Sequence, residues 1–161
     1  MKRLLIVLVM AIAMATGACH HLDDERVPLL RVWLSFNFQA DWTRYGTPAA
    51  GDARLFVKNT LTPPDYPYTA LESTGFGGLL LVCDVMGNPK AFCAACPVEV
   101  KQDVLVFIND DNHAECPHCH SIFDVFSLDG VPIAGRAADE GWSLRRYSVG
   151  PGDRGEYMLV R

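Results

Sequence analysis

The sequence predicts an all-β fold, made of short antiparallel strands joined by turns rich in glycine and proline. Apolar and polar residues alternate with a period of two over residues 31–38, which is the period of a half-buried strand. After the apolar N-terminal run, no stretch sustains a helical period for three turns. Two Cys-x-x-Cys pairs, with nineteen residues between them, predict a metal site carried by this fold.

The individual strands are expected where short apolar runs end at turn residues. The segment 41–52 contains glycine, proline and threonine, and we expect it to be a loop. Besides 31–38, strands are expected at 54–57, 79–83, 104–108, 122–126, 144–149 and 157–160, with the last two forming a closing hairpin.

The N-terminus has the pattern of an export signal. Lys2 and Arg3 precede an apolar run over 4–15 that is too short to span a bilayer. The run ends in Thr16-Gly17-Ala18-Cys19, which resembles the lipobox of bacterial lipoproteins and implies cleavage before Cys19 and acylation of its sulfur. An ordinary secretory peptide with an incidental Cys19 is the alternative.

The expected organisation follows from this signal. It comprises a signal peptide over 1–18, a polar tether over 19–28 and one domain over 29–161. Removing Lys2 and Arg3 with the signal lowers the formal charge from −5 to −7. Because no cluster of basic residues remains, nucleic acid is not an expected partner. We expect a lipoprotein of the bacterial cell envelope, facing the periplasm or the exterior and held to the bilayer by acylated Cys19.

Four cysteines form the predicted metal site: Cys93, Cys96, Cys116 and Cys119. A Cys-x-x-Cys turn presents two sulfurs on one side of a tight knuckle, and two facing knuckles supply a tetrahedral ligand set. Cys83 lies in an apolar run and is expected to be a buried thiol outside the site. The metal-binding subdomain is expected at about 91–124.

The residues around the two Cys-Pro dipeptides follow a family pattern. The loop that begins at Cys116-Pro117 continues through Ser121, Phe123 and Asp124, and a Gly-x-Pro-x-x-Gly segment follows at 130–135. With Cys96-Pro97 as the first loop, residues 77–160 resemble a Rieske-type ferredoxin domain. The resemblance implies an antiparallel sandwich with a two-knuckle metal-binding subdomain, like that of rubredoxins and zinc ribbons. It also implies a [2Fe-2S] cluster held by both loops.

The ligand set departs from that family. Val98 stands at the position of the first histidine, and Cys119 stands at the position of the second. Cys93 is added three residues before Cys96. We therefore expect four cysteines in place of two cysteines and two histidines. His118 and His120 flank Cys119, and either is an alternative ligand or a hydrogen-bond donor to a sulfur.

Two cofactors suit four thiolates. A [2Fe-2S] cluster would make the protein an electron-transfer module for a redox partner protein, with a potential near the roughly −400 mV of all-cysteine ferredoxins. One Zn²⁺ ion would make it a structural or interaction lipoprotein, and disulfides are a third option. The resemblance favours the [2Fe-2S] cluster, so an electron-transfer module is the first expectation and the zinc or disulfide lipoprotein is the alternative. The signal lacks a twin-arginine motif, so the chain is expected to be exported unfolded, which favours zinc. No catalytic residues are identified, and an enzyme activity of its own is not expected.

Overall fold

The computed structural model describes residues 22–161, so the predicted signal peptide over 1–18 and the predicted lipidation site Cys19 lie outside the described residues. Most of the regular structure in the described part is antiparallel β, as the sequence predicts. The strands are β1 (Val32–Phe36), β2 (Ala53–Phe56), β3 (Ser73–Thr74), β4 (Leu79–Cys83), β5 (Pro89–Cys93), β6 (Phe107–Ile108), β7 (Ala114–Glu115), β8 (Ile122–Asp124), β9 (Val131–Ala134), β10 (Arg146–Tyr147), β11 (Val149–Gly150) and β12 (Met158–Val160). The helices are α2 (Gln39–Tyr45), α3 (Arg136–Glu140) and the 3-10 turn η1 (Lys58–Thr60).

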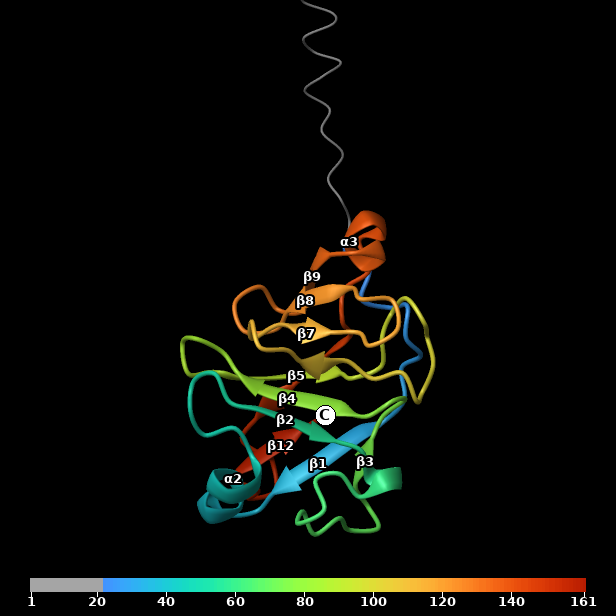
Figure 1. The fold of residues 1–161 in the computed structure, drawn as a ribbon. Coiled ribbons are helices and arrows are strands. Elements are labelled where there is room, and N and C mark those ends of the chain that lie inside the picture. Colours follow the sequence, from blue (N-terminus) through green and yellow to red (C-terminus); the bar gives the residue numbers. More distant parts are fainter. Residues whose placement is uncertain (1–21) are drawn as a thin grey trace, which may run out of the picture.

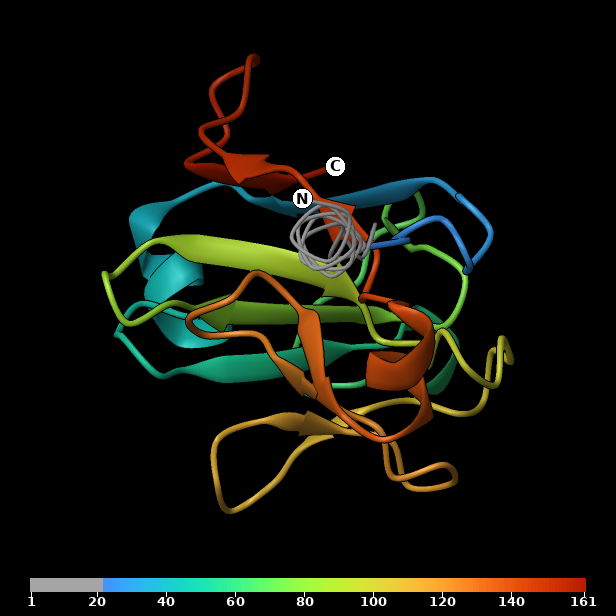
Figure 2. The same ribbon diagram turned by 90° about the horizontal axis from the view of Figure 1, so that it is seen from above.

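The strands form three four-stranded sheets, ordered β11-β12-β1-β3, β10-β5-β4-β2 and β6-β7-β8-β9. Figure 1 shows the second sheet between the other two, with β7 to β9 on one side and β1 and β12 on the other. Figure 2, turned by 90°, also shows β4 and β5 between β1 and the loops of the third sheet. The central sheet therefore has neighbours on both faces.

Strand β4 explains why the central sheet needs two neighbours. All five of its residues, Leu79–Cys83, are buried. Leu79 and Leu81 pack in the core shared with β1, whereas Leu80 and Val82 pack in the core shared with the third sheet. A strand that is covered on both faces carries a continuous apolar run rather than an alternating one. The run of leucines is thus the signature of a central strand.

The core between the first and second sheets is aromatic. Phe36 of β1 makes edge-to-face contacts with Trp42 at 5.0 Å, Tyr66 at 5.9 Å and Phe56 at 6.1 Å between ring centroids. Trp42 belongs to α2, which overlaps the segment 41–52 that we expected to be a loop. With seven residues, α2 is too short to show a helical period in the sequence.

The third sheet is made of short strands over a second core. Phe123 and Val125 are buried there with Phe92 of the central sheet. The strand expected at 104–108 regularly pairs only at Phe107–Ile108, while Leu105 forms an isolated bridge with Ala95. This bridge ties the chain before β6 to the chain after β5, directly beside the cysteines.

The residues assigned to the end of the tether pack against the domain from Asp23 onward. Asp23 forms a parallel bridge with Trp142, and Val27 is 1 % exposed. The guanidinium of Arg145 donates to the carbonyl oxygen of Val27 over 2.8 Å. Between residues 22 and 161, no helix combines the length and apolar character that crossing a membrane requires.

Candidate metal site

The second Cys-x-x-Cys pair forms the turn between β7 and β8. The backbone N–H of His120 donates to the carbonyl of Cys116 over 3.1 Å, and the N–H of Cys116 donates to the carbonyl of Ser121 over 3.0 Å. His120 has a positive φ of 54°, which closes the turn. Pro117 suits the second position of such a turn because its fixed φ is already right and no N–H is needed there. The turn presents Cys116 and Cys119 side by side, as the spacing predicted.

A second turn of the same kind begins at Cys96, after β5. The N–H of Val100 donates to the carbonyl of Cys96 over 2.9 Å, and Val100 has a positive φ of 50°. Cys96 itself is held by its N–H, which donates to the carbonyl of Val104 over 3.0 Å. The knuckle therefore runs forward from Cys96 to Val100.

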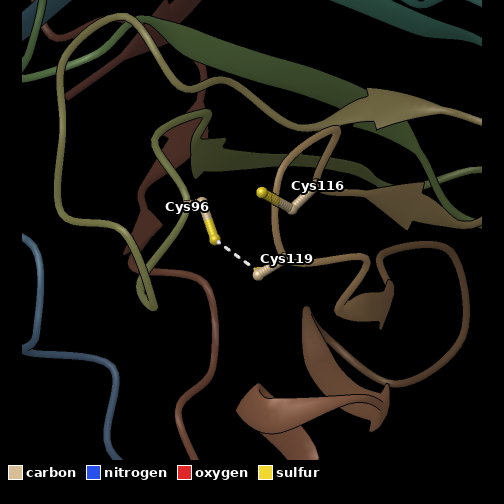
Figure 3. A group of neighbouring side chains, drawn as sticks. All are labelled: Cys96, Cys116 and Cys119. Carbon is tan, nitrogen blue, oxygen red and sulfur yellow. Dashed lines mark hydrogen bonds between the residues drawn. The ribbon is translucent and has the colours of Figure 1, made fainter.

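The two turns bring three sulfurs together. The Sγ atoms of Cys96, Cys116 and Cys119 all lie within 4.8 Å of one another, and those of Cys96 and Cys119 are 3.6 Å apart (Figure 3). Cys96 and Cys116 are buried, and Cys119 is half-buried. This group can hold a metal ion. It contains both cysteines of the second predicted pair and the second cysteine of the first pair.

Cys93 does not join the group. The backbone stays extended from β5 to Cys96, since the N–H of Cys93 donates to the carbonyl of Arg145 and Ala95 bridges Leu105. Side chains three residues apart on an extended chain point to opposite faces. Cys93 and Ala95 accordingly pack against Val27, in a cluster distinct from the core that contains Cys96. The expected set of four cysteines is a set of three in the structure.

The surroundings of Cys96 combine burial with backbone donors. Burial raises the pKa of the Cys96 thiol, while the backbone N–H groups of Glu99 and Val98, which point at the sulfur, oppose this rise. Such N–H groups stabilise a thiolate. The knuckle is thus already arranged for a negatively charged sulfur.

Cys119 is supported by Ser121. Burial raises the pKa of the Cys119 thiol, but hydrogen bonds from the hydroxyl and backbone N–H of Ser121, together with the neighbouring thiols, outweigh it and lower the pKa. In the structure Cys119 Sγ donates to Ser121 Oγ over 3.3 Å, and Ser121 Oγ also accepts the N–H of Ala137 over 3.1 Å. When Cys119 is a thiolate, the hydroxyl of Ser121 can turn its hydrogen toward the sulfur while it still accepts from Ala137.

The two histidines lie outside the ligand group. His120 is exposed, and its Nδ1 is 3.2 Å from a carboxylate oxygen of Glu115. This contact and a hydrogen bond from Asn109 lower the pKa of Glu115, the hydrogen bond from Asn109 being the larger cause. His118 is exposed in the middle of the second knuckle. Val98, which stands where the resemblance would require a histidine, packs against the apolar core beside the site.

Sequence reasoning missed that the first knuckle begins at Cys96 rather than at Cys93. The proline after the cysteine was the available signal, because Cys96-Pro97 and Cys116-Pro117 both open a turn while Cys93 is followed by alanine. Comparisons of the chain with protein-family models, with curated proteins and with solved structures give no match.

Proposed function

We propose that this protein is a metal-binding protein in which Cys96, Cys116 and Cys119 hold one zinc ion. The observation that carries the proposal is the mutual approach of the three sulfurs to within 4.8 Å. Zinc binds thiolates at about 2.3 Å in tetrahedral geometry, so neighbouring sulfurs around one ion lie about 3.8 Å apart. The 3.6 Å between the Sγ atoms of Cys96 and Cys119 agrees with this sulfur–sulfur distance.

Zinc in this position would hold two layers of the fold together. Cys96 follows β5 of the central sheet, while Cys116 and Cys119 belong to the turn of the β7–β8 hairpin in the third sheet. An ion bound to both turns joins these sheets where the strands of the third sheet are only two to four residues long. Structural zinc contributes its binding free energy directly to folding.

The wider proposal takes its other parts from the sequence. A Rieske-like sandwich with a knuckle subdomain at about 91–124 is supported by the three antiparallel sheets and by the two Cys-Pro turns. Export and lipid anchoring through Cys19 are supported by the N-terminal pattern. The protein is then a structural or interaction lipoprotein of the bacterial cell envelope. Mass spectrometry of the protein from a bacterial membrane fraction, with a diacylated Cys19 as the expected N-terminus, checks this part.

Electron transfer through a [2Fe-2S] cluster is the second candidate, favoured by the Cys-Pro loops and the Ser121-x-Phe123-Asp124 sequence. Such a cluster divides four protein ligands between two irons. The described residues bring three cysteine sulfurs together, and these are close enough to surround a single ion. For this reason zinc is the better supported cofactor.

Metal analysis of the full-length chain, purified without oxygen, separates the two candidates. One zinc per chain and no visible absorption is the expected result. Two irons and two labile sulfides per chain, with visible absorption bands, would instead establish the electron-transfer candidate. A protein that takes up neither zinc nor iron would contradict both candidates.

A further inference from the structure

The two cysteine turns have the same backbone structure. In each, a cysteine is followed by proline, and the N–H of the fifth residue donates to the carbonyl of the first, over 2.9 Å at Cys96 and 3.1 Å at Cys116. In each, the fifth residue has a positive φ, 50° at Val100 and 54° at His120. Neither fifth residue is glycine, the residue that adopts a positive φ most readily. The shared conformation is therefore a specific feature of the two turns.

Equivalent positions of the two turns can therefore be compared. The first position is a cysteine in both, Cys96 and Cys116. The fourth position is Cys119 in the second turn, and this residue belongs to the sulfur group. The fourth position of the first turn is Glu99. A pair of such turns offers four ligand positions, and Glu99 occupies the one that has no cysteine.

The surroundings of Glu99 suit this role. Its backbone N–H points at the Cys96 sulfur, so the residue lies at the edge of the site. Its side chain is 23 % exposed, and its ion pair with Lys101 is long, with 4.0 Å between Nζ and the carboxylate oxygen. A partly exposed pair of that length stabilises the side-chain position little. The carboxylate can leave Lys101 without losing a strong contact.

We propose that Glu99 is the fourth ligand of the metal centre, and that one of its carboxylate oxygens completes a tetrahedral set of three sulfurs and one oxygen. This inference rests on the proposed zinc site. In the structure the carboxylate faces Lys101 and lies outside the sulfur group, so ligation requires a change of side-chain conformation. Carboxylates bind zinc at about 2.0–2.2 Å and need no deprotonation at neutral pH. A zinc ion with three thiolates and one carboxylate has a net charge of −2.

Two variants of Glu99 test the assignment in the full-length protein. Glu99→Gln weakens the ligand, and we expect zinc affinity to fall about tenfold or more in competition with a chelator. Glu99→Cys converts the set to four sulfurs, and we expect tighter binding. With Co²⁺ in place of zinc, the sulfur-to-cobalt charge-transfer absorption of Glu99→Cys should rise by about a third, from three thiolates to four. Glu140→Gln, an exposed glutamate on α3, is the matched control.

The outcomes separate this inference from the proposed function. If the wild-type protein binds zinc but both Glu99 variants match it in affinity and in cobalt absorption, Glu99 is not a ligand and the zinc site remains. If the wild-type protein binds no zinc, both proposals fail. Circular dichroism of the metal-free variants, expected to match the wild type, excludes misfolding as the cause of a lower affinity.

Discussion

The sulfur of Cys96 lies 3.6 Å from the sulfur of Cys119, although the two residues are 23 positions apart in the sequence. The contact joins a turn of the central sheet to a turn of the third sheet. The sulfur of Cys93, only three residues before Cys96, lies in a different cluster with Val27. Which cysteine sulfurs come together is thus decided by strand pairing as well as by spacing.

Substituting single cysteines tests this arrangement. Cys96→Ala, Cys116→Ala and Cys119→Ala should each abolish stoichiometric zinc binding, because two thiolates remain in the group. Cys93→Ala should retain one zinc per chain. Zinc content after dialysis against a weak chelator measures both effects, and Cys83→Ala, which alters another buried thiol, is the control. Loss of zinc from Cys93→Ala at the level of the other three would show that Cys93 is a ligand.

Zinc affinity should rise with pH. The burial that raises the pKa of Cys96 keeps this thiol protonated across the neutral range, so its proton must leave when the metal binds. Each such proton makes the apparent affinity about tenfold higher per pH unit. Competition titrations at pH 6, 7 and 8 should therefore give at least this slope. An affinity independent of pH would mean that the sulfurs are already thiolates or are not ligands.

Ser121→Ala should destabilise the third sheet. Ser121 is fully buried, and its Oγ accepts the N–H of Ala137 at the start of α3 as well as contacting Cys119. Removing the hydroxyl leaves the N–H of Ala137 without its acceptor, a loss of about 1–3 kcal/mol. Urea unfolding of the metal-free protein measures this directly. Ser127→Ala, at an exposed serine, should unfold as the wild type does.

Val100→Gly should stabilise the protein. Val100 has a φ of 50°, a left-handed conformation that is costly for a β-branched residue and open to glycine. Relief of this strain exceeds the entropy that glycine adds to the unfolded chain, for a net gain of about 1 kcal/mol. A higher urea midpoint is the expected result. Val98→Gly adds the same unfolded-state entropy without relieving a positive φ, so it should lower the midpoint.

Asp84 should make stability depend on acid pH. Asp84 is 4 % exposed, and hydrogen bonds from Asn88, from Met86 and from Lys90 lower its pKa below 3.8, the backbone N–H of Asn88 being the largest cause. The stability that this carboxylate contributes is present above its unfolded pKa and is lost as the pH falls through the lower folded value.

Asp84→Asn should therefore unfold at lower urea than the wild type at pH 7, and the difference should narrow between pH 5 and pH 2. A constant difference over that range would contradict the assigned shift. Asp110→Asn, at an exposed turn, should leave the midpoint unchanged at both ends of the range.

The strands that could be predicted are those with local patterns. The alternation over 31–38 corresponds to β1, and the leucine run corresponds to β4. Burial of one face of a strand gives alternating apolar residues and burial of both faces gives a continuous apolar run, so both patterns can be recognised in consecutive residues. Helix α2 and the two-residue strands β3 and β7 were not predicted, because seven residues or two residues do not establish a period. Strands β6, β10 and β11 are equally short, but they lie in or overlap the longer runs 104–108 and 144–149 that were expected to be strands. The pairing of β1 with β12 depends on residues more than a hundred positions apart.

At the candidate metal site, the Cys-x-x-Cys spacing was enough to predict a group of cysteines that includes Cys96, Cys116 and Cys119, because a short turn is set by its own residues. The Cys-x-x-Cys spacing by itself does not decide the place of Cys93, since that spacing fits both a turn and an extended strand, and the only local sign was the missing proline after Cys93. Pairing of β5 with β4, in which Cys93 faces Leu79, keeps that segment extended and turns its sulfur away from Cys96. Hydrogen bonds between strands that are distant in the sequence thus decide which sulfurs lie together. Such long-range pairing cannot be recognised from a short stretch of sequence.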